Sequence, residues 1–344
     1  MASPMATSMQ RTSVTIRVPA TTANLGPGYD VLGLALNLWL TVKATRADTF
    51  SMKVSGDGAE AIELDESKNL IVQCVKTAFE IAEQPYPPIA YEIHSDIPFG
   101  CGCGSSSAAA VAGAMVGFIL CGKTLMVSRE EAMLQVATKI EGHPDNAAPC
   151  LYGGLQIGMH NGSRFVTHRV PMPNSLWCVL FVPAKKMKKH TSETRKLIPT
   201  EVSMKDAIHN MSRTALLVLA LSTSQLDLLK ECADDRFHQQ QRKVMFPHLE
   251  PCIDAAMAAG AVYTFLSGAG PSVCAFVPGR VGETIIMDPQ QRLCEDVAAA
   301  MVKAAAGAGV EGRCVVTHPS ETGAHVTGLE PSLSSSILKF PAGL

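Results

Sequence analysis

Hydrophobic and polar positions alternate along the chain with two different periods, which indicates a mixture of strands and helices. A period of two predicts strands, and a spacing of three to four predicts helices. The predicted strands are residues 14–18, 31–46, 50–54, 89–94, 155–159, 165–170, 176–182, 262–266, 273–277 and 314–317. The predicted helices are residues 69–83, 108–120, 128–140, 204–221, 249–259 and 290–306. Because the two types do not alternate as regular βαβ units, the pattern favours an α+β fold in two lobes.

Turns break this pattern at three places. Residues 19–30 (PATTANLGPGYD) follow the first predicted strand, which we expect to end at Pro19. Residues 98–107 (PFGCGCGSSS) follow a strand and precede a long apolar helix, and residues 266–272 (LSGAGPS) separate two strands. We also expect residues 50–54 to form a hairpin with residues 31–46.

The middle segment has the features of a phosphate-binding loop. Gly100, Gly102 and Gly104 allow a backbone with positive φ that can lie close to a ligand. The serines that follow can cap the next helix, whose first N–H groups and dipole suit a phosphate. A tight turn before a buried helix is the alternative interpretation of the glycines.

A second glycine motif does not have the right context. Gly117, Gly122, Lys123 and Thr124 match the pattern G-x-x-x-x-G-K-T of a P-loop. A P-loop follows a strand, whereas this motif lies in an Ala-rich apolar stretch. We therefore predict a helix that ends at Gly122.

Length and composition limit the class of protein. A chain of 344 residues favours two domains, which we place at residues 12–170 and 171–334, with loose tails at 1–11 and 335–344. A net charge of -2 gives no reason to expect nucleic acid, and no apolar run predicts a membrane span. The 11 cysteines lack C-x-x-C pairs, which favours a reducing compartment, and we expect a cytoplasmic protein. A cleavable organelle signal in the Ser/Thr-rich first dozen residues is the alternative.

The three turn-rich segments together, in this order and at these separations, resemble the GHMP kinase superfamily. Within it, residues 19–36, 141–154 (EGHPDNAAPCLYGG), 190–195 (HTSETR) and 267–272 resemble the homoserine kinases. The resemblance spans about residues 14–317. It implies a lobe similar to ribosomal protein S5 domain 2, a ferredoxin-like C-terminal lobe, and a homodimer. It also implies transfer of the γ-phosphoryl group of ATP to the side-chain hydroxyl of L-homoserine in threonine biosynthesis.

The resemblance assigns residues to the nucleotide and to Mg²⁺. The phosphate-binding positions are Pro98, Gly100, Cys101, Gly102, Cys103, Gly104, Ser105, Ser106 and Ser107. Asn69 matches a segment beside the adenine. Ser106 and Glu141 match the Mg²⁺ ligands, and oxygen ligands are those that Mg²⁺ prefers. The alternative for Glu141 is a surface position at a helix end.

A further set matches the substrate site. The substrate-binding candidates are Asn24, Asp30, His143, Asp145, Arg195 and Arg242. Homoserine carries an ammonium and a carboxylate, so its site needs both a carboxylate and a cation. Asp30, His143 and Asp145 suit the ammonium and hydroxyl, whereas the two arginines suit the carboxylate. For Arg242 a solvated surface position is the alternative.

The resemblance also implies a mechanism. The catalytic candidates are Asn146, Asp145, Thr191 and Arg195. Phosphoryl transfer depends mainly on positioning and charge neutralisation. We expect direct in-line attack by the hydroxyl with Asn146 as a hydrogen-bonding residue, and Asp145 as a general base is the alternative.

Three alternatives stay open at this stage. Cys101 and Cys103 replace the usual loop residues, and they are either redox-sensitive or simply small enough for a tight loop. The chain could also be another small-molecule kinase of the superfamily, of the mevalonate or shikimate type. A sensor that binds ligand without catalysis is the third possibility.

Overall fold

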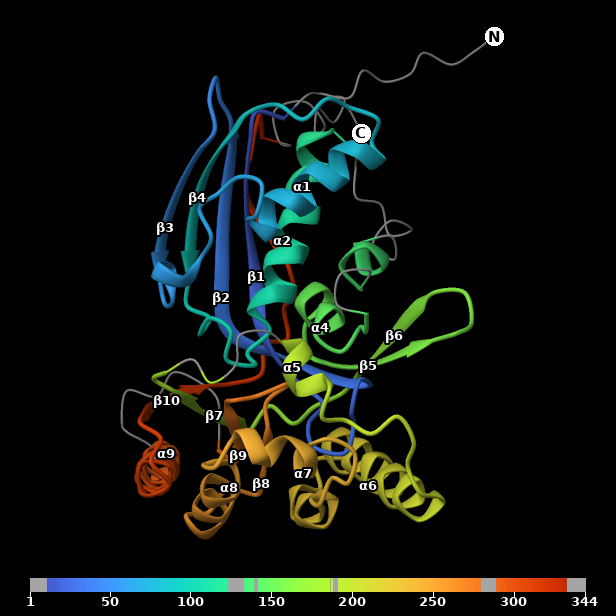
Figure 1. Ribbon diagram of the computed structural model, residues 1–344, viewed down its shortest axis with the longest axis vertical. Coiled ribbons are helices and arrows are strands. Elements are labelled where there is room, and N and C mark those ends of the chain that lie inside the picture. The colour runs from blue at the N-terminus through green and yellow to red at the C-terminus, as the bar shows by residue number, and fades with distance from the viewer. Residues whose placement is uncertain are drawn as a thin grey trace, which may run out of the picture.

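The computed structural model describes residues 11–122, 133–138, 142–185, 187, 191–279 and 289–332, which form two lobes (Figure 1). The strands of the first lobe are β1 (Ser13–Ala23), β2 (Leu32–Arg46), β3 (Ser51–Gly56), β4 (Ile89–Ser95), β5 (Leu155–His160), β6 (Phe165–Val170) and β11 (His325–Glu330). Its helices are α1 (Leu70–Ile81), α2 (Ser105–Leu120) and α4 (Ala147–Tyr152), with a 3₁₀ turn η1 (Ala59–Ala61). Of the predicted helix 128–140, only residues 133–138 are described, and they are helical.

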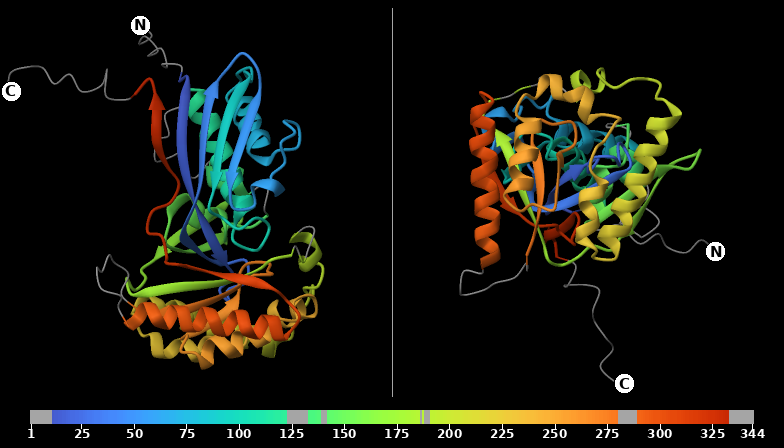
Figure 2. Two further views of the ribbon diagram at one scale, coloured as in Figure 1. Left: turned by 90° about the vertical axis from the view of Figure 1, so that its left-hand side faces the viewer. Right: turned by 90° about the horizontal axis from the view of Figure 1, so that it is seen from below.

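The second lobe is built on a smaller sheet. Its strands are β7 (Leu176–Pro183), β8 (Tyr263–Leu266), β9 (Val273–Pro278) and β10 (Gly312–Thr317). Its helices are α5 (Thr191–Arg195), α6 (Met204–Ser222), α7 (Gln239–Arg242), α8 (Leu249–Ala258) and α9 (Pro289–Gly307), with 3₁₀ turns η2 (Leu226–Cys232) and η3 (Lys243–Met245). The strand order is β10-β7-β9-β8, and all pairs are antiparallel. Figure 2 shows α8 and α9 on the outer face of this sheet.

The first sheet has the order β11-β1-β2-β4-β3, and β5 pairs with both β2 and β6. Helices α1 and α2 lie against one face of this sheet (Figure 1). The two helices pack closely at Gly113 and Gly117 of α2, where there is no room for a side chain. A Cβ at Gly113 would lie 2.4 Å from the carbonyl oxygen of Ile71, and one at Gly117 would lie 2.5 Å from the Cβ of Ala78. The predicted α+β fold in two lobes is confirmed.

The apparent P-loop motif is part of a helix, as predicted. Gly117 lies in the interior of α2, and Gly122 follows the C-cap residue Cys121 with φ of 70°. Its backbone N–H donates to the carbonyl of Ile119, which is the usual bond at a glycine that ends a helix. Lys123 and Thr124 lie outside the described residues.

Two predictions about the first strands are wrong. β1 does not end at Pro19 but continues to Ala23, because the register with β2 shifts between Pro19 and Ala20, where a residue without an N–H is tolerated. β3 does not form a hairpin with β2. It lies parallel to β4, which itself pairs with β2 and so separates the two strands.

The last strand leaves the second lobe. Residues 325–330 fall in the range 171–334 that the sequence analysis gives to the C-terminal domain. As strand β11 they pair antiparallel with β1 at the edge of the first sheet. The pattern of His325–Glu330 is interrupted by Gly328, so its alternation does not predict a strand. The domain boundary at residue 170 stays a prediction, and residues 1–10 and 333–344 of the predicted tails lie outside the described residues.

One hydrophobic cluster connects the two lobes. It contains Leu34 and Val111 of the first lobe together with Cys178, Phe265 and Phe276 of the second. A separate cluster lies between the second sheet and helices α8 and α9. Burial of apolar surface is the main favourable term in folding, so the shared cluster couples the lobes. Among the described residues, no helix is long and apolar enough to cross a lipid bilayer.

Candidate active site

The glycine loop precedes α2 and depends on its glycines for space. Gly100, Gly102 and Gly104 have φ of 69°, 87° and 70°. A Cβ at Gly104 would lie 1.9 Å from Oγ1 of Thr21, and a Cβ at Gly102 would lie 2.3 Å from the carbonyl oxygen of Ser267. The loop therefore needs glycine at both positions.

The other two turn-rich segments hold the loop through its carbonyl groups. The backbone N–H of Ser272 donates to the carbonyl of Cys101 at 3.0 Å, and that of Thr21 donates to the carbonyl of Cys103 at 3.1 Å. The hydroxyl of Ser267 donates to the carbonyl of Gly102 at 2.7 Å. The three segments that are far apart in the sequence thus meet at one loop.

The start of α2 differs from the prediction that serines cap it. Its N-cap residue is Gly104, which makes no side-chain capping bond, and Ser105, Ser106 and Ser107 form the first turn. A glycine can take the N-cap position with its left-handed backbone. The three serines therefore follow the N-cap and occupy the first turn of the helix. The backbone N–H groups of a first turn have no carbonyl before them within the helix. This arrangement offers donors and the positive end of the helix dipole to an anion.

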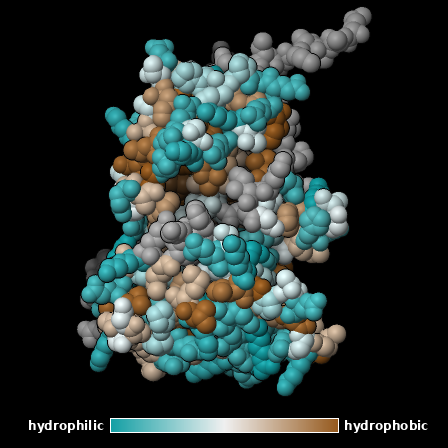
Figure 3. Space-filling view, viewed as in Figure 1, coloured by the Kyte–Doolittle hydropathy of each residue, from teal (hydrophilic) through white to brown (hydrophobic). Residues whose placement is uncertain are grey.

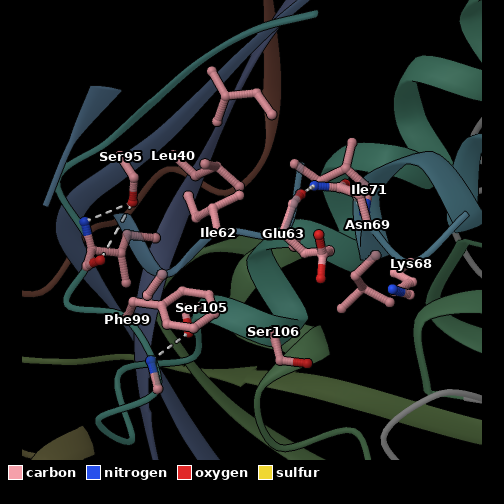
Figure 4. A pocket seen from close by; sticks show the side chains of 16 residues that line it. Leu40, Ile62, Glu63, Lys68, Asn69, Ile71, Ser95, Phe99, Ser105 and Ser106 are labelled. Atoms are coloured by element: carbon pink, nitrogen blue, oxygen red, sulfur yellow. Dashed lines mark hydrogen bonds between the residues drawn. The ribbon is translucent and has the colours of Figure 1, made fainter. Parts of the chain in front are cut away.

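A cavity of about 430 Å³ lies beside the loop (Figure 4). Its apolar walls come from the side chains of Leu40, Ile62, Ile71, Ile93, Ile97 and Phe99. Ser105 and Ser106 line the cavity at the start of α2. Glu63, Lys68 and Asn69 lie across the cavity from Phe99 (Figure 4). On the face of the molecule shown in Figure 3, the first lobe has larger apolar patches than the second lobe, which is mostly hydrophilic there. A mostly apolar cavity with a few polar groups is typical of a small-molecule site.

Asn69 shapes the wall of this cavity. Its Oδ1 accepts hydrogen bonds from the N–H groups of Ile71 and Val72, so it caps α1. Its Nδ2 donates to the carbonyl of Glu63 at 2.6 Å. Both polar groups of the side chain are used within the protein, and a direct nucleotide contact of Asn69 stays a prediction.

The two predicted Mg²⁺ ligands differ in what the structure shows of them. Ser106 is exposed and lines the cavity, and its hydroxyl makes no hydrogen bond to any described residue. A hydroxyl oxygen of this kind at the phosphate end of a helix fits a Mg²⁺ ion. Glu141 lies outside the described residues.

A cluster of polar side chains gathers Asp30, His143 and Asp145, as predicted. One ligand atom of each lies within 4.8 Å of the others, so the cluster could hold a cation. Nδ1 of His143 lies in a short hydrogen bond with Oδ1 of Asp145 and 4.0 Å from Oδ1 of Asp30. Burial lowers the pKa of His143, but the hydrogen bond and charge of Asp145 and the charge of Asp30 outweigh it, so this pKa is raised.

Arg195, at the end of α5, is paired with Asp30. Its NH1 and NH2 donate to the two carboxylate oxygens of Asp30, both at 2.9 Å. This hydrogen bonding raises the pKa of Arg195, so the arginine keeps its charge. The guanidinium also lies 5.6 Å from the ring centre of Tyr29.

Arg242 is buried, so the alternative of a surface arginine is wrong. Only 1% of the residue is exposed. Its NH1 donates to the carbonyl of Gly268 at 3.1 Å and to Nδ1 of His238 at 3.0 Å. Nε is buried without a partner, and NH2 makes no hydrogen bond to a described residue. Burial lowers the pKa of Arg242, but a guanidinium stays charged at physiological pH, so the site contains a buried cation that has no carboxylate partner in the described part of the chain.

The carbonyl of Gly268 connects this arginine with Asn24. It accepts Nδ2 of Asn24 at 2.8 Å as well as Arg242, and Oδ1 of Asn24 accepts the backbone N–H of Asp30 at 3.0 Å. Asn24 therefore fixes the backbone that presents Asp30. A Cβ at Gly268 would lie 3.2 Å from the carbonyl oxygen of Gly102, so the polar cluster lies against the glycine loop.

Asn146 lies between the two parts of the site. Its Oδ1 accepts the hydroxyl of Thr21 at 2.7 Å, and its Nδ2 donates to Oδ1 of Asp145 at 3.3 Å. Thr21 in turn is bonded to the glycine loop through Cys103. The side chain of Thr191, the remaining catalytic candidate, is not among those described.

The two loop cysteines differ in accessibility. Cys103 is fully buried, whereas Cys101 is partly exposed and its thiol donates to the carbonyl of Phe99. A buried thiol is not within reach of an oxidant in solution. Redox sensitivity of this loop would therefore depend on Cys101.

Three residues of the site were missed by sequence reasoning. They are Tyr29, which faces both arginines, His238, which bonds Arg242, and Gly268, which acts through its carbonyl. His238 precedes Arg242 by four residues, and that spacing places two side chains on one helical face. A carbonyl contact such as that of Gly268 leaves no signal in the sequence.

Comparison with protein families gives the class of protein. The model of the GHMP kinases N terminal domain matches residues 69–154, and that of the GHMP kinases C terminal matches residues 217–286. The first match contains the glycine loop, and the second contains the turn that braces it. The fold and the site therefore define a GHMP kinase.

Individual relatives narrow the class further. Homoserine kinase of Desulfitobacterium hafniense is 38% identical over 272 residues, which are 79% of this chain and 90% of that protein. Homoserine kinase of Moorella thermoacetica is 37% identical over 266 residues, 77% and 88% of the two chains. The crystal structure of homoserine kinase from Cytophaga hutchinsonii shares the fold with a TM-score of 0.77 at 24% identity, over 95% of this chain and 99% of that one. The chain belongs to the homoserine kinase family.

Proposed function

We propose that this protein transfers the γ-phosphoryl group of ATP to the side-chain hydroxyl of L-homoserine, a reaction of threonine biosynthesis. The observation that carries the proposal is Arg242. A buried guanidinium without a carboxylate partner is costly, and its Nε and NH2 form a two-donor edge that suits the carboxylate of a ligand. Asp30 and Asp145 supply negative charge for an ammonium group beside it, and His143 lies between them as the hydrogen-bond partner of Asp145.

The nucleotide would bind at the glycine loop and its cavity. The first-turn N–H groups of α2 would hold the phosphates, and the apolar walls around Ile62 and Phe99 would receive the adenine. The closeness of Gly268 to Gly102 supports this proposal, because phosphates at the loop would lie beside the amino-acid pocket.

A divalent cation would be held by Ser106 and, as the resemblance implies, by Glu141. When bound, Mg²⁺ neutralises charge on the transferred phosphoryl group. The position of Ser106 beside the cavity, with no hydrogen-bond partner for its hydroxyl among the described residues, supports this assignment. Loss of ADP release on chelation and its recovery with MgCl₂ would test it.

The hydroxyl of the substrate would be oriented rather than strongly activated. Asn146, fixed by Thr21 and Asp145, would donate or accept a hydrogen bond at the reacting oxygen. Asp145 would serve mainly as a charge that binds the ammonium together with its partner His143. Positioning supplies most of the catalysis in such a mechanism.

A coupled ADP-release assay tests the function directly. The panel is L-homoserine, L-threonine, L-serine, mevalonate and shikimate, each with ATP, with and without Mg²⁺. We expect the highest kcat/KM for L-homoserine. A preference for mevalonate or shikimate would assign another kinase activity, and no ADP release with any acceptor would indicate a sensor.

The quaternary structure is proposed from the resemblance, and the location is proposed from the cysteine pattern. A homodimer is the expected state, and sedimentation of the purified protein tests it. Cytoplasmic location is tested by imaging a C-terminally tagged chain in its own cells.

A further inference from the structure

His238 contacts Arg242 through NH1, away from the edge formed by Nε and NH2. His238 lies at the start of α7, four residues before Arg242, so both side chains lie on one face of the turn. The NH1 group of Arg242 has two hydrogens, and they are used by Nδ1 of His238 and by the carbonyl of Gly268. The remaining edge, formed by Nε and NH2, has no partner among the described residues.

The hydrogen bonds fix the tautomer of His238. A carbonyl oxygen only accepts, so Nε2, which lies 2.9 Å from the carbonyl of Gly26, carries the ring hydrogen. An arginine only donates, so Nδ1 must be the acceptor for Arg242. The imidazole is therefore neutral. Burial lowers the pKa of His238, with Arg242 acting in the same direction and Asp235 in the opposite one.

Asp235 holds the backbone at His238. Its Oδ2 accepts the N–H groups of His238 and Gln239 at 2.8 and 2.7 Å, and its Oδ1 accepts Nδ2 of Asn210 at 2.8 Å. The oxygen Oδ2 lies 3.7 Å from Nε2 of His238, beyond hydrogen-bond distance. The carboxylate thus fixes the position of the imidazole without taking the place of Gly26 as its acceptor.

Tyr29 fixes the plane of the imidazole ring. The two rings stack with centroids 5.2 Å apart and an interplanar angle of 30°. The same tyrosine ring lies 5.4 Å from the guanidinium carbon of Arg242. His238 itself has no exposed surface, so it can influence a ligand only through Arg242.

We propose that His238 is a positioning residue, which holds Arg242 with its two-donor edge directed at the carboxylate of the substrate. The inference rests on the proposed function. A free arginine side chain loses rotamer entropy when it binds a ligand, and a preset arginine has already lost it. His238 should therefore affect the KM for homoserine and not the transfer step.

Two substitutions separate the two hydrogen bonds of the imidazole. Asn at this position places its Oδ1 near the site of Nδ1 and can still accept from Arg242. Gln places its amide nitrogen near the site of the imidazole Nε2 and can still donate to Gly26. In that orientation it leaves no acceptor at the site of the imidazole Nδ1, where Arg242 donates. We expect His238→Gln to raise the KM for L-homoserine about 10- to 100-fold, the range of one charged hydrogen bond, with kcat and the KM for ATP changed less than about threefold. We expect His238→Asn to bring the KM back to within about threefold of the unmodified protein.

A substrate without the carboxylate gives an independent readout. 3-Amino-1-propanol has the ammonium and hydroxyl of homoserine but no carboxylate for Arg242. We expect unmodified protein and His238→Gln to have equal kcat/KM for this amino alcohol. A structural role alone would reduce activity on both acceptors.

Equal KM values for the Asn and Gln variants, or a loss in the Gln variant that persists with 3-amino-1-propanol, would overturn the inference. Should the Gln variant not fold, His238→Leu, which fills similar space with neither hydrogen bond, is measured in its place, and the same increase in KM is expected. No phosphoryl transfer to homoserine by the unmodified protein would instead refute the proposed function. The two failures are therefore distinguishable.

Discussion

At the scale of single residues, the site depends on side chains that are already bonded within the protein. Asp145 illustrates this, because it is only 1% exposed and one of its oxygens serves both His143 and Asn146. Such a carboxylate is well placed to bind a cationic group.

The substitution Asp145→Asn tests this assignment. We expect the KM for L-homoserine to rise at least about tenfold, with kcat changed less than about threefold, because a charge that binds the ammonium is lost. Steady-state kinetics with each substrate varied gives both constants. Asp254→Asn, an exposed carboxylate on α8, is the control and should leave both constants unchanged. A collapse of kcat at constant KM would identify Asp145 as the general base.

The sequence identifies most candidate residues but not their surroundings. Arg195 and Arg242 are both candidates for the substrate carboxylate in the sequence, yet Arg195 is paired with Asp30, whereas Arg242 is buried with no carboxylate partner among the described residues. The difference arises from their hydrogen-bond partners, since Arg195 meets the carboxylate of Asp30 and Arg242 meets the carbonyl of Gly268. Long-range backbone contacts of this kind have no local pattern from which they could be predicted.

At the scale of elements, the glycine loop and the turn from Ser267 to Ser272 form one unit. Periodicity predicts the longer helices and most strands correctly, because these elements bury regular faces, but it misses the short helices α4, α5 and α7. It fails for the continuation of β1 beyond Pro19 and for β11, where a bulge and a glycine interrupt the alternation. The pairing of β3 with β4 is a choice of partner, and alternation within a strand does not specify the partner.

The substitution Gly104→Ala tests how strictly the loop is built. We expect an increase in the KM for ATP of at least about tenfold and a loss of stability beyond about 1–2 kcal/mol, because a Cβ would displace Thr21 and shift the first turn of α2. Denaturant unfolding and ATP kinetics measure the two effects. Gly309→Ala is the matched control, since its φ is 77° and nothing lies within 4 Å. It should cost only about 1–2 kcal/mol of backbone strain and leave the KM for ATP unchanged. Equal effects of the two substitutions would show that space at Gly104 is unimportant.

The turn is anchored by His248, which gives it a pH dependence. Nε2 of His248 donates to the carbonyl of Pro271 at 2.8 Å, and Nδ1 is buried without a partner. Burial lowers the pKa of His248, although the hydrogen bond to Pro271 opposes this. The unfolded chain therefore takes up a proton that the folded chain does not, and stability falls as the pH drops below about 6.5.

The substitution His248→Gln can keep the hydrogen bond to Pro271 but does not titrate. We expect the free energy of unfolding of the unmodified protein to decrease more between about pH 7 and pH 5 than that of the variant. Urea unfolding at the two pH values gives the comparison. His238 is present in both proteins, so its titration cancels. Parallel decreases in the two proteins would contradict the role of His248.

At the scale of the whole molecule, the lobes share one hydrophobic cluster and one functional site. The cluster includes Leu34 and Val111 on one side and Phe265 and Phe276 on the other. The chain also connects the lobes a second time. After the second lobe it returns to the first sheet as β11, close to the end of its described part. Separate unfolding of either lobe would expose part of the shared cluster.

The two tryptophans of the chain allow this coupling to be measured. Trp39 lies in β2 of the first lobe, and Trp177 lies in β7 of the second. The variants Trp39→Phe and Trp177→Phe each leave one fluorescent reporter. Each is unfolded in urea and followed both by its own fluorescence and by circular dichroism, so that any change in stability caused by the substitution cancels. We expect the two probes to coincide in each variant, as in a cooperative transition. A fluorescence midpoint that differs from the circular dichroism midpoint in either variant would show that the lobes unfold independently.

The pairing of Asp30 with Arg195 has a consequence for selectivity. A ligand with a single charge could replace only one member of the pair and would leave the other without a counterion. An amino acid carries both charges, so its ammonium could face Asp30 while its carboxylate faces Arg195 as well as Arg242, both of which lie against the ring of Tyr29. Simple hydroxy acids and amines present in the same cell would therefore compete poorly, because each would separate the Asp30–Arg195 pair and replace only one of its two charges.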